Sequence, residues 1–490
     1  MLPYWTVGIF FAIFGALLSL AVVCAYYSRA SIGLIGPLLL AFAVLVAWPI
    51  VSDLLHGCFD PLGSRNVFVY LFSLYAVSLP LLTYLRGESV SEVATTRAIA
   101  KAFAITVLSL IFFLLGYRSR TAIRISSSLP LIGQVSIQRL QLATLIIITA
   151  VALWFALFLY SIGGLGIFLQ TGYADIYELE QGKEYLGFSL TLIPTCVLLL
   201  FHVANRTRSR IVWLAVALSL AGTIVLLLSG SRRRLLITLV LSLLVYCHYA
   251  IRRISTKILL TLTFVGAVAV SSLGLLRSIP PEELASRQTV QFLAEQSPSQ
   301  LFYTFLEIGE PATNFETFPF IVDEISNGMP FQWGKTYLEA PLVLIPRVLY
   351  PGRPLTASQW YVSKFFPDVE AQFGGRPLFF LGEAYLNFGV MGPPALMLLV
   401  GIGCRIVYSY LERNKFTAES VLIYAAILGC IPTAIRIDFA TTLKVLLGST
   451  LPLILLVVWH SRANRGLSRV HFRMVHSGGS HGDLGHNLQQ

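Results

Sequence analysis

The sequence predicts an all-α, polytopic membrane protein with about twelve transmembrane helices. The prediction rests first on composition, since only 12% of the 490 residues are charged and 56% are hydrophobic. It rests second on a mean hydropathy of +0.75. Soluble domains carry about 25% charged residues and cannot hide this much apolar surface from water. A soluble enzyme, a disordered chain and a nucleic-acid-binding protein are therefore excluded.

Each expected helix is a run of about 20 apolar residues, the length that crosses the hydrocarbon core. The first run lacks a basic start and a cleavage site, so we expect a retained span rather than a signal peptide. Residues 1–460 are expected to form a single transmembrane domain, and 461–490 a cytoplasmic, basic and partly disordered tail. The spans are 4–27, 31–52, 66–85, 98–117, 140–161, 186–204, 211–229, 234–251, 258–276, 378–404, 418–435 and 440–460.

Basic clusters between the spans set their direction. With twelve spans, five clusters and both termini fall on one side, which the positive-inside rule assigns to the cytoplasm. The opposite face carries the connection 277–377, a loop of about 100 residues that is long enough to be expected to be functional. The clusters are Arg118, Arg120, Arg124 and Arg139; Arg206, Arg208 and Arg210; Arg252, Arg253 and Lys257; Arg413 and Lys415; and Arg462, Arg465, Arg469 and Arg473.

A second set of arginines is expected on the outer face, against this trend. Guanidinium groups offer bidentate donors suited to phosphate, and charges at a span's end are costly unless they meet anions. The prolines that follow Arg353 and Arg376 favour extended turns there. The alternatives are pairing with Asp368 or Glu370, or contact with lipid headgroups, which we prefer for Arg234. The candidate anion-binding residues are Arg232, Arg233, Arg347, Arg353, Arg376 and Arg436.

Two carboxylates accompany these arginines. Glu383 shares a helix face with Asn387 at the mouth of the tenth span, although a first-turn acid favoured by the helix dipole explains it equally well. Asp438 lies two residues after Arg436 in an expected tight reversal, where an internal salt pair is the alternative. The sequence Asp368-x-Glu370 indicates a divalent metal only weakly, so no metal site is predicted.

Four segments together resemble the bacterial Wzy-type oligosaccharide repeat-unit polymerases. They are the Gly-Ser-Arg turn at 230–232, the sequence IPRVLYPGRP at 345–354 in the large loop, GEAYLNFGVMG at 382–392, and the Arg-x-Asp turn at 436–438. The likeness is strongest between residues 230 and 440. By this match Arg232, Arg353, Arg436 and Asp438 correspond to the family's motif residues, and Arg376 and Glu383 are placed by their own motif.

The resemblance implies a metal-independent, cofactor-free glycosyltransferase in the bacterial inner membrane, with a periplasmic loop at 277–377. It would transfer a growing glycan from undecaprenyl diphosphate to a new lipid-linked repeat unit. Arginines, rather than a cation, would neutralise the departing diphosphate. The expected partners are lipid-linked oligosaccharides, membrane lipid, a chain-length-regulating co-polymerase and the repeat-unit flippase.

The acceptor hydroxyl of such a reaction must lose a proton, and all eight histidines are predicted at cytoplasmic positions. A carboxylate must then serve as the base. An acid close to an arginine is a weaker base, so we expect Asp438 to orient Arg436 and Glu383 to accept the proton. The further candidates are Glu307, Glu310 and Asp323 in the large loop.

Two other functions use similar substrates. An O-antigen ligase takes the same lipid-linked donor, but that family is expected to carry a functional periplasmic histidine. A lipid-linked oligosaccharide flippase or exporter would bind diphosphate without bond chemistry, and would more often show broken helices and charges at the membrane midplane. The polar clusters of this sequence gather instead at one face, which favours the polymerase.

Overall fold

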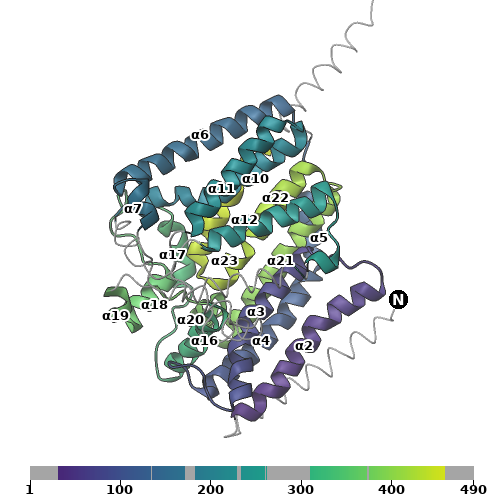
Figure 1. Ribbon diagram of the computed structural model, residues 1–490. Helices are drawn as coiled ribbons and strands as arrows, with labels where there is room; N and C mark the ends of the chain where they lie inside the picture. Colours follow the sequence, from purple (N-terminus) through teal and green to yellow (C-terminus); the bar gives the residue numbers. More distant parts are fainter. Residues whose placement is uncertain are drawn as a thin grey trace, which may run out of the picture.

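The computed structural model describes residues 31–133, 135–170, 182–228, 233–259, 261, 310–371 and 375–457. Within these residues every regular element is a helix, which confirms the all-α prediction (Figure 1). The expected span 4–27, most of the span 258–276 and the tail 461–490 lie outside the described residues, as do Arg232 and Glu307.

Ten of the twelve expected spans are present as apolar helices, eight of them long enough to cross a membrane. The two shorter ones, α11 (Arg210–Leu228) and α12 (Arg233–Tyr246), correspond to the segments 211–229 and 234–251. The chain is thereby confirmed as a multi-pass membrane protein. The eight are Ile32–Leu55 in α2 (Ser31–Leu55), α3 (Ser64–Arg86), α4 (Thr96–Tyr117), α6 (Ile137–Ser161), Tyr185–Thr207 with α10 (Ser189–Thr207), Phe380–Arg413, Ala418–Arg436 and Phe439–Val457.

Polar contacts between connections show that one end of the bundle gathers the basic clusters. Arg413 donates to the carbonyl oxygens of Ser126 and Leu129 at 2.8 and 2.7 Å, at the end of α5 (Arg120–Ser128). Arg206 pairs with Glu419 at 3.4 Å. Tyr249, just before the cluster at 252–257, stacks on Phe416 with ring centroids 5.6 Å apart. Four of the five clusters therefore lie at one end, in agreement with the predicted alternation.

The opposite end is covered by the described part of the large loop. The Thr95 hydroxyl, which caps α4, donates to Asp323 at 2.8 Å, and the Ser91 hydroxyl donates to Glu316 at 2.5 Å. Both acids belong to α16 (Glu310–Ser326), which packs on α3 and α4. The loop therefore folds back onto the end of the spans that lies opposite the basic clusters.

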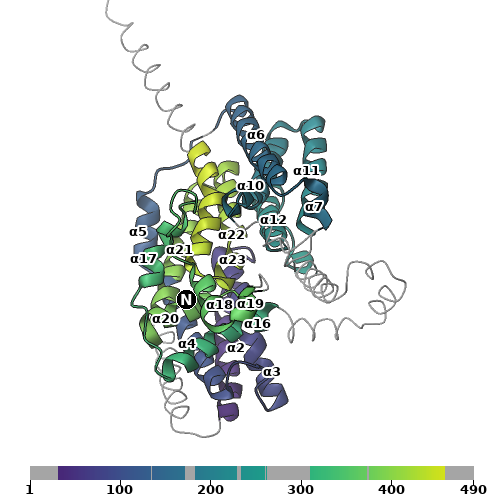
Figure 2. The same cartoon turned by 90° about the vertical axis from the view of Figure 1, so that its left-hand side faces the viewer.

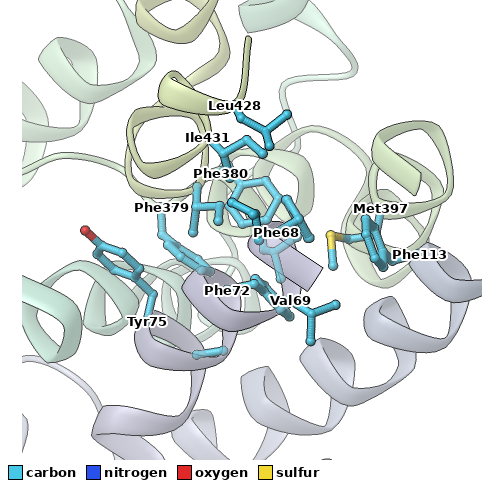
Figure 3. Packing of buried hydrophobic residues seen from close by; sticks show 14 of the residues in the cluster. Phe68, Val69, Phe72, Tyr75, Phe113, Phe379, Phe380, Met397, Leu428 and Ile431 are labelled. Atoms are coloured by element: carbon cyan, nitrogen blue, oxygen red, sulfur yellow. The ribbon is translucent and has the colours of Figure 1, made fainter. Parts of the chain in front are cut away.

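Aromatic side chains fill the core between these helices. Phe68 stacks on Phe113 with ring centroids 4.5 Å apart, and Phe72 meets the edge of Phe380 at 6.0 Å (Figure 3). In Figure 2, α6, α10, α11 and α12 stand to one side of the group formed by α2, α3, α4 and α16. A smaller apolar cluster around Phe158 and Phe168 lies in the group that contains α6, α10 and α12.

The tenth expected span differs from the prediction of one continuous helix. It consists of α20 (Phe380–Phe388), a 3₁₀ turn η2 (Gly389–Met391) and α21 (Gly392–Arg413). Gly389 has φ +60° and ψ −147°, a conformation open to glycine but strained for other residues. A side chain at Gly392 would collide with the carbonyl group of Ala384. The two glycines thus permit a sharp break just after Glu383.

The helices α4 and α21 approach so closely that only glycine fits at their contact. A methyl group at Gly401 would collide with the backbone of Phe113 and Tyr117, whereas one at Gly403 would meet nothing within 4 Å. Alanine normally stabilises a helix interior by about 1 kcal/mol over glycine. Both positions lie on α21, so alanine should change helix propensity equally at the two. Any difference between the two substitutions then reports the packing against α4.

We therefore expect Gly401→Ala to destabilise the protein by about 1–3 kcal/mol, because the helices must separate. Gly403→Ala should be neutral or stabilising by up to about 1 kcal/mol. Thermal unfolding of the purified proteins in detergent measures both. Equal unfolding temperatures for the two variants would contradict the close packing of α4 on α21.

Candidate functional site

The carboxylates of Glu383 and Asp438 converge on the first turn of the last helix, Phe439–Val457. Glu383 Oε2 accepts a hydrogen bond from the Phe439 amide at 2.6 Å, and Asp438 Oδ1 accepts one from the Thr441 amide at 2.9 Å. The first amides of a helix lack intrahelical partners and carry partial positive charge, so they favour carboxylates. Two of the predicted site residues are thus brought together at one helix end.

Asp438 is completely buried and uses both carboxylate oxygens. Besides capping the last helix, it accepts a hydrogen bond through Oδ2 from the Ser358 amide at 3.3 Å. Ser358 lies in the first turn of α18 (Ala357–Phe365), and its hydroxyl accepts from the Leu378 amide at 2.9 Å. Asp438 therefore ties the outer loop to the last helix.

Glu383 is also buried, with 1% of its surface exposed, but it is satisfied at one oxygen only. Its Oε1 atom is shielded from solvent and has no hydrogen-bond partner of ordinary geometry within the described residues, although the Thr336 hydroxyl lies beside the carboxylate. A buried acceptor without a donor costs about 1–3 kcal/mol. This oxygen is the one atom of the carboxylate that no backbone amide of the described residues holds.

Asn387 places a further helix, α17 (Lys335–Val343), against Glu383. Its amide nitrogen donates to the Thr336 hydroxyl at 2.8 Å and to the Glu383 carbonyl at 2.9 Å, while its oxygen accepts from the Gly334 amide at 2.9 Å. The shared helix face of Glu383 and Asn387, expected from their spacing, is thereby confirmed. Asn387 fixes both the acid and the start of α17.

Tyr337 of α17 is a site residue that the sequence did not indicate. Its ring packs against Phe439 at 5.4 Å, and its hydroxyl is buried without a hydrogen-bond partner among the described residues. Burial raises the pKa of this phenol, and the nearby Glu383 carboxylate raises it further. Tyr337 is therefore a neutral hydrogen-bond donor beside Glu383. No motif or periodicity in the sequence around it pointed to this role.

Arg353 lies at the end of a turn that its own amide closes on the Tyr350 carbonyl at 3.1 Å, and its side chain holds the far end of α17. Its Nη1 atom donates to the carbonyl oxygens of Val343 and Ile345, both at 3.1 Å. Cations stabilise the carbonyl end of a helix. Arg347, in the turn between α17 and Arg353, is half-buried, and its Nε atom has no hydrogen-bond partner in the described part of the chain.

Arg376 lies in a segment without regular secondary structure, and the alternative of pairing with Asp368 or Glu370 is wrong, because its partner is another acid. Its guanidinium pairs with Glu316 of α16 at 3.8 Å and stacks over the Phe366 ring at 4.4 Å. Asp368 and Glu370 instead occupy the exposed first turn of α19 (Pro367–Ala371), where the helix dipole favours acids.

The remaining arginines stand at helix ends. Arg436 is the last residue of α23 (Ile431–Arg436), and the chain then turns through Ile437 to Asp438, as the predicted reversal requires. Arg233 is the first residue of α12, which packs against α22 (Ala418–Gly429) and α23. The position of Arg232 lies outside the described residues.

The described histidines lie away from this site, at the end of the basic clusters. His202 hydrogen-bonds Tyr246 at 2.8 Å, and His248 lies 4.0 Å from Asp60. His56 bonds the carbonyl of Ser52 at the end of α2. Among the described residues, the acid–base groups around the last helix are therefore Glu383, Asp438 and Tyr337. Asp323, a further candidate base, accepts both of its hydrogen bonds from Thr95.

Comparison with known proteins identifies the family. The family model for O-antigen polysaccharide polymerase Wzy matches residues 8–463. The O-antigen polymerases of Salmonella typhimurium (strain LT2) and Salmonella typhi are each 27% identical over 135 residues, which are 26% of this chain and 33% of theirs. The similarity thus spans about a third of the length of these curated relatives. No solved structure matches the chain.

The hydrogen bonds of Asp438 predict a measurable stability difference between two substitutions. Asp438→Ala removes a helix cap, worth about 0.5–2 kcal/mol, and leaves the buried Ser358 amide without its acceptor. Asp438→Asn keeps a side-chain acceptor for the Thr441 amide, so its free energy of unfolding should fall less. In detergent, the unfolding temperature should be highest for wild type, lower for Asp438→Asn and lowest for Asp438→Ala. The exposed Asp368→Ala is the control, and an Asp438→Ala protein as stable as this control would refute the capping role.

Proposed function

This chain belongs to the O-antigen polysaccharide polymerase Wzy family, and we propose that it polymerises lipid-linked oligosaccharide repeat units. In this proposal it is a glycosyltransferase of the bacterial inner membrane, with both termini in the cytoplasm. The glycan carried by one undecaprenyl diphosphate is transferred to a second lipid-linked repeat unit at the periplasmic face. The clustering of basic residues at the other end of the bundle supports this orientation.

The geometry of Glu383 is the observation that carries the proposal. A transferase of this kind needs a base that takes the proton of the attacking hydroxyl while the bond to the diphosphate breaks. The Phe439 amide fixes Oε2, so Oε1 has a defined position from which to accept that proton. The neutral Tyr337 hydroxyl, on the adjacent helix, is suited to hold the same sugar hydroxyl or a neighbouring one.

Asp438 has a positioning role in this proposal. Both of its oxygens are engaged by backbone amides, so it is less available than Glu383 to take up a proton. It fixes the turn that begins at Arg436, and orienting that arginine remains our proposal for its function. This division of roles between the two acids follows from their different hydrogen bonding.

The arginines would receive the charge of the departing diphosphate, in the way that preorganised donors stabilise charge developing in a transition state. Arg347, Arg376 and Arg436 are proposed to do so from the loop and from α23, and Arg232 and Arg233 from the start of α12. Arg353 would act from the turn that also anchors α17. A chain-length-regulating co-polymerase and the repeat-unit flippase are the proposed protein partners.

The proposal is tested by deleting the gene in its own bacterium and complementing with wild type or variants. Loss of long glycan chains with retention of a single-repeat product is the expected result. Intact lipid-linked polymer that is no longer transferred would identify a ligase instead. Absence of lipid-linked repeat units from the periplasmic face would identify a flippase. Either outcome overturns the polymerase assignment.

The role of Glu383 is tested by single-turnover transfer between purified lipid-linked substrates. Glu383→Gln should slow transfer by about 10²–10⁴-fold, the usual contribution of a general base. Asp438→Asn should retain more activity, and Glu339→Gln, a half-buried acid on α17 that pairs with Lys335, should be unaffected. A nearly normal rate in Glu383→Gln, with Asp438→Asn inactive, would reverse the two assignments.

The diphosphate role is tested at Arg347, whose substitution breaks no hydrogen bond at its Nε atom. Arg347→Lys keeps the charge but loses the planar, bidentate fork. We expect shorter glycan chains at unchanged protein level, with the loss greatest at low substrate concentration. Arg253→Lys, at the opposite end of the bundle, is the matched control. Equal chain lengths for both variants would remove Arg347 from the site.

A further inference from the structure

The short helix α17 has two faces of different character. Its inner face carries Tyr337, which packs on Phe439, and Ala340 and Val343, which form a small buried cluster with Ala440. Its outer face carries Leu338, which is 78% exposed, and the exposed Leu342. The inner face therefore covers the buried carboxylate site, and the outer face leaves large apolar side chains uncovered.

The exposed apolar surface extends beyond the helix on both sides. Trp333 precedes α17 and is 75% exposed, while Leu349 follows it and is 77% exposed. We call this surface the α17 patch and define it by Trp333, Leu338, Leu342, Val348, Leu349 and Tyr350. The patch lies outside the helices that are long enough to span a membrane. Large apolar side chains exposed together on one short segment indicate contact with a membrane or another apolar partner.

The neighbouring part of the same loop has the opposite character. Between residues 356 and 371, which form α18 and α19, no large hydrophobic side chain is strongly exposed. The exposed side chains there include those of Gln359, Lys364, Asp368 and Glu370. The loop thus presents a polar surface and an apolar surface, which indicates that they face two different solvents.

The α17 patch is also joined to the exposed surface of a spanning segment. The amides of Gln332 and Trp333 donate to the carbonyls of Leu386 and Asn387 at 3.0 and 3.2 Å, which fixes the start of the patch to the end of α20. The Tyr337 ring stacks on Phe388, with centroids 6.1 Å apart. Phe388 and the following Val390 and Met391 are themselves exposed apolar residues within the candidate span Phe380–Arg413.

We propose that the α17 patch is immersed in the acyl chains of the periplasmic leaflet of the inner membrane, so that α17 is an interfacial helix. Three features favour lipid over a protein partner. The patch continues the lipid-facing surface of a span, and its borders carry Trp333 and Tyr350, residue types that concentrate at membrane interfaces. The third feature is that the charged neighbours on α17, Lys335 and Glu339, approach one another to 3.9 Å, because paired charges cost less free energy beside an apolar medium than single ones.

The proposal assigns a lipid contact to a part of the large loop and does not depend on the chemistry proposed for Glu383. An interfacial helix lies in the membrane plane with its apolar face about 5–10 Å into the headgroup and acyl boundary. The inner face of α17 would then hold the carboxylate site close to the level of the lipid headgroups.

Spin-label accessibility tests this placement. Leu338→Cys and Leu349→Cys are made in a chain whose six native cysteines are replaced, labelled with a nitroxide and placed in nanodiscs of phosphatidylethanolamine and phosphatidylglycerol. Both labels should collide with oxygen, which concentrates in the acyl region, and be shielded from a water-soluble nickel chelate. Gln359→Cys on α18 is the control and should show the reverse.

Two outcomes would overturn the proposal. Free access of the nickel chelate to labels at 338 and 349, equal to that at 359, would place the patch in water. Exclusion of both oxygen and nickel would show that protein covers the patch, either a second copy, a partner or another segment of this chain. If one labelled variant fails to fold, as judged by size-exclusion chromatography, the other decides the test.

Discussion

The start of the last helix is the constraint on which the site depends. A helix that begins inside a packed membrane protein exposes amide groups that water cannot reach, and each needs an acceptor. Asp438 and Glu383 supply these acceptors at Thr441 and Phe439. Because the two acids come from different parts of the chain, capping one helix also fixes α20 and, through Ser358, the outer loop. The arrangement leaves one carboxylate oxygen of Glu383 in a defined place.

The helix α17 connects this buried chemistry with the surroundings of the protein. Asn387 holds its first turn and Arg353 its last, so the helix is fixed at both ends across the start of the last helix. Tyr337 faces Glu383 on one side, while Leu338 faces outward on the other. A lipid-linked substrate has a polar head and an apolar tail. In the proposals above, α17 lies between the carboxylate site, which would bind the polar head, and the acyl chains of the membrane, which would hold the apolar tail.

Hydropathy alone predicted the ten spans that the described residues contain, because membrane insertion acts on local sequence. Glu383 and Asp438 could be singled out because acids are rare in such apolar surroundings. Their actual partners could not, since the Glu383–Phe439 and Arg376–Glu316 contacts join distant segments. Tyr337 belongs to no recognisable pattern. The break between α20 and α21 depends on the dihedral angles at Gly389, which no hydropathy pattern encodes.

The capping of the last helix also bears on where a diphosphate could bind. A helix N-terminus is usually a good site for phosphate, because its free amides and partial positive charge favour anions. Here two carboxylates of the protein itself occupy that position, so a phosphate would meet both a lack of free donors and two nearby acids. In the proposed reaction the diphosphate must therefore be held by side chains rather than by the free amides of this helix. The arginines of the outer loop and of α23 offer the planar, permanently charged donors for this. Holding the diphosphate through arginine side chains would in turn leave Glu383 next to the sugar hydroxyl and place the positive charge next to the leaving group.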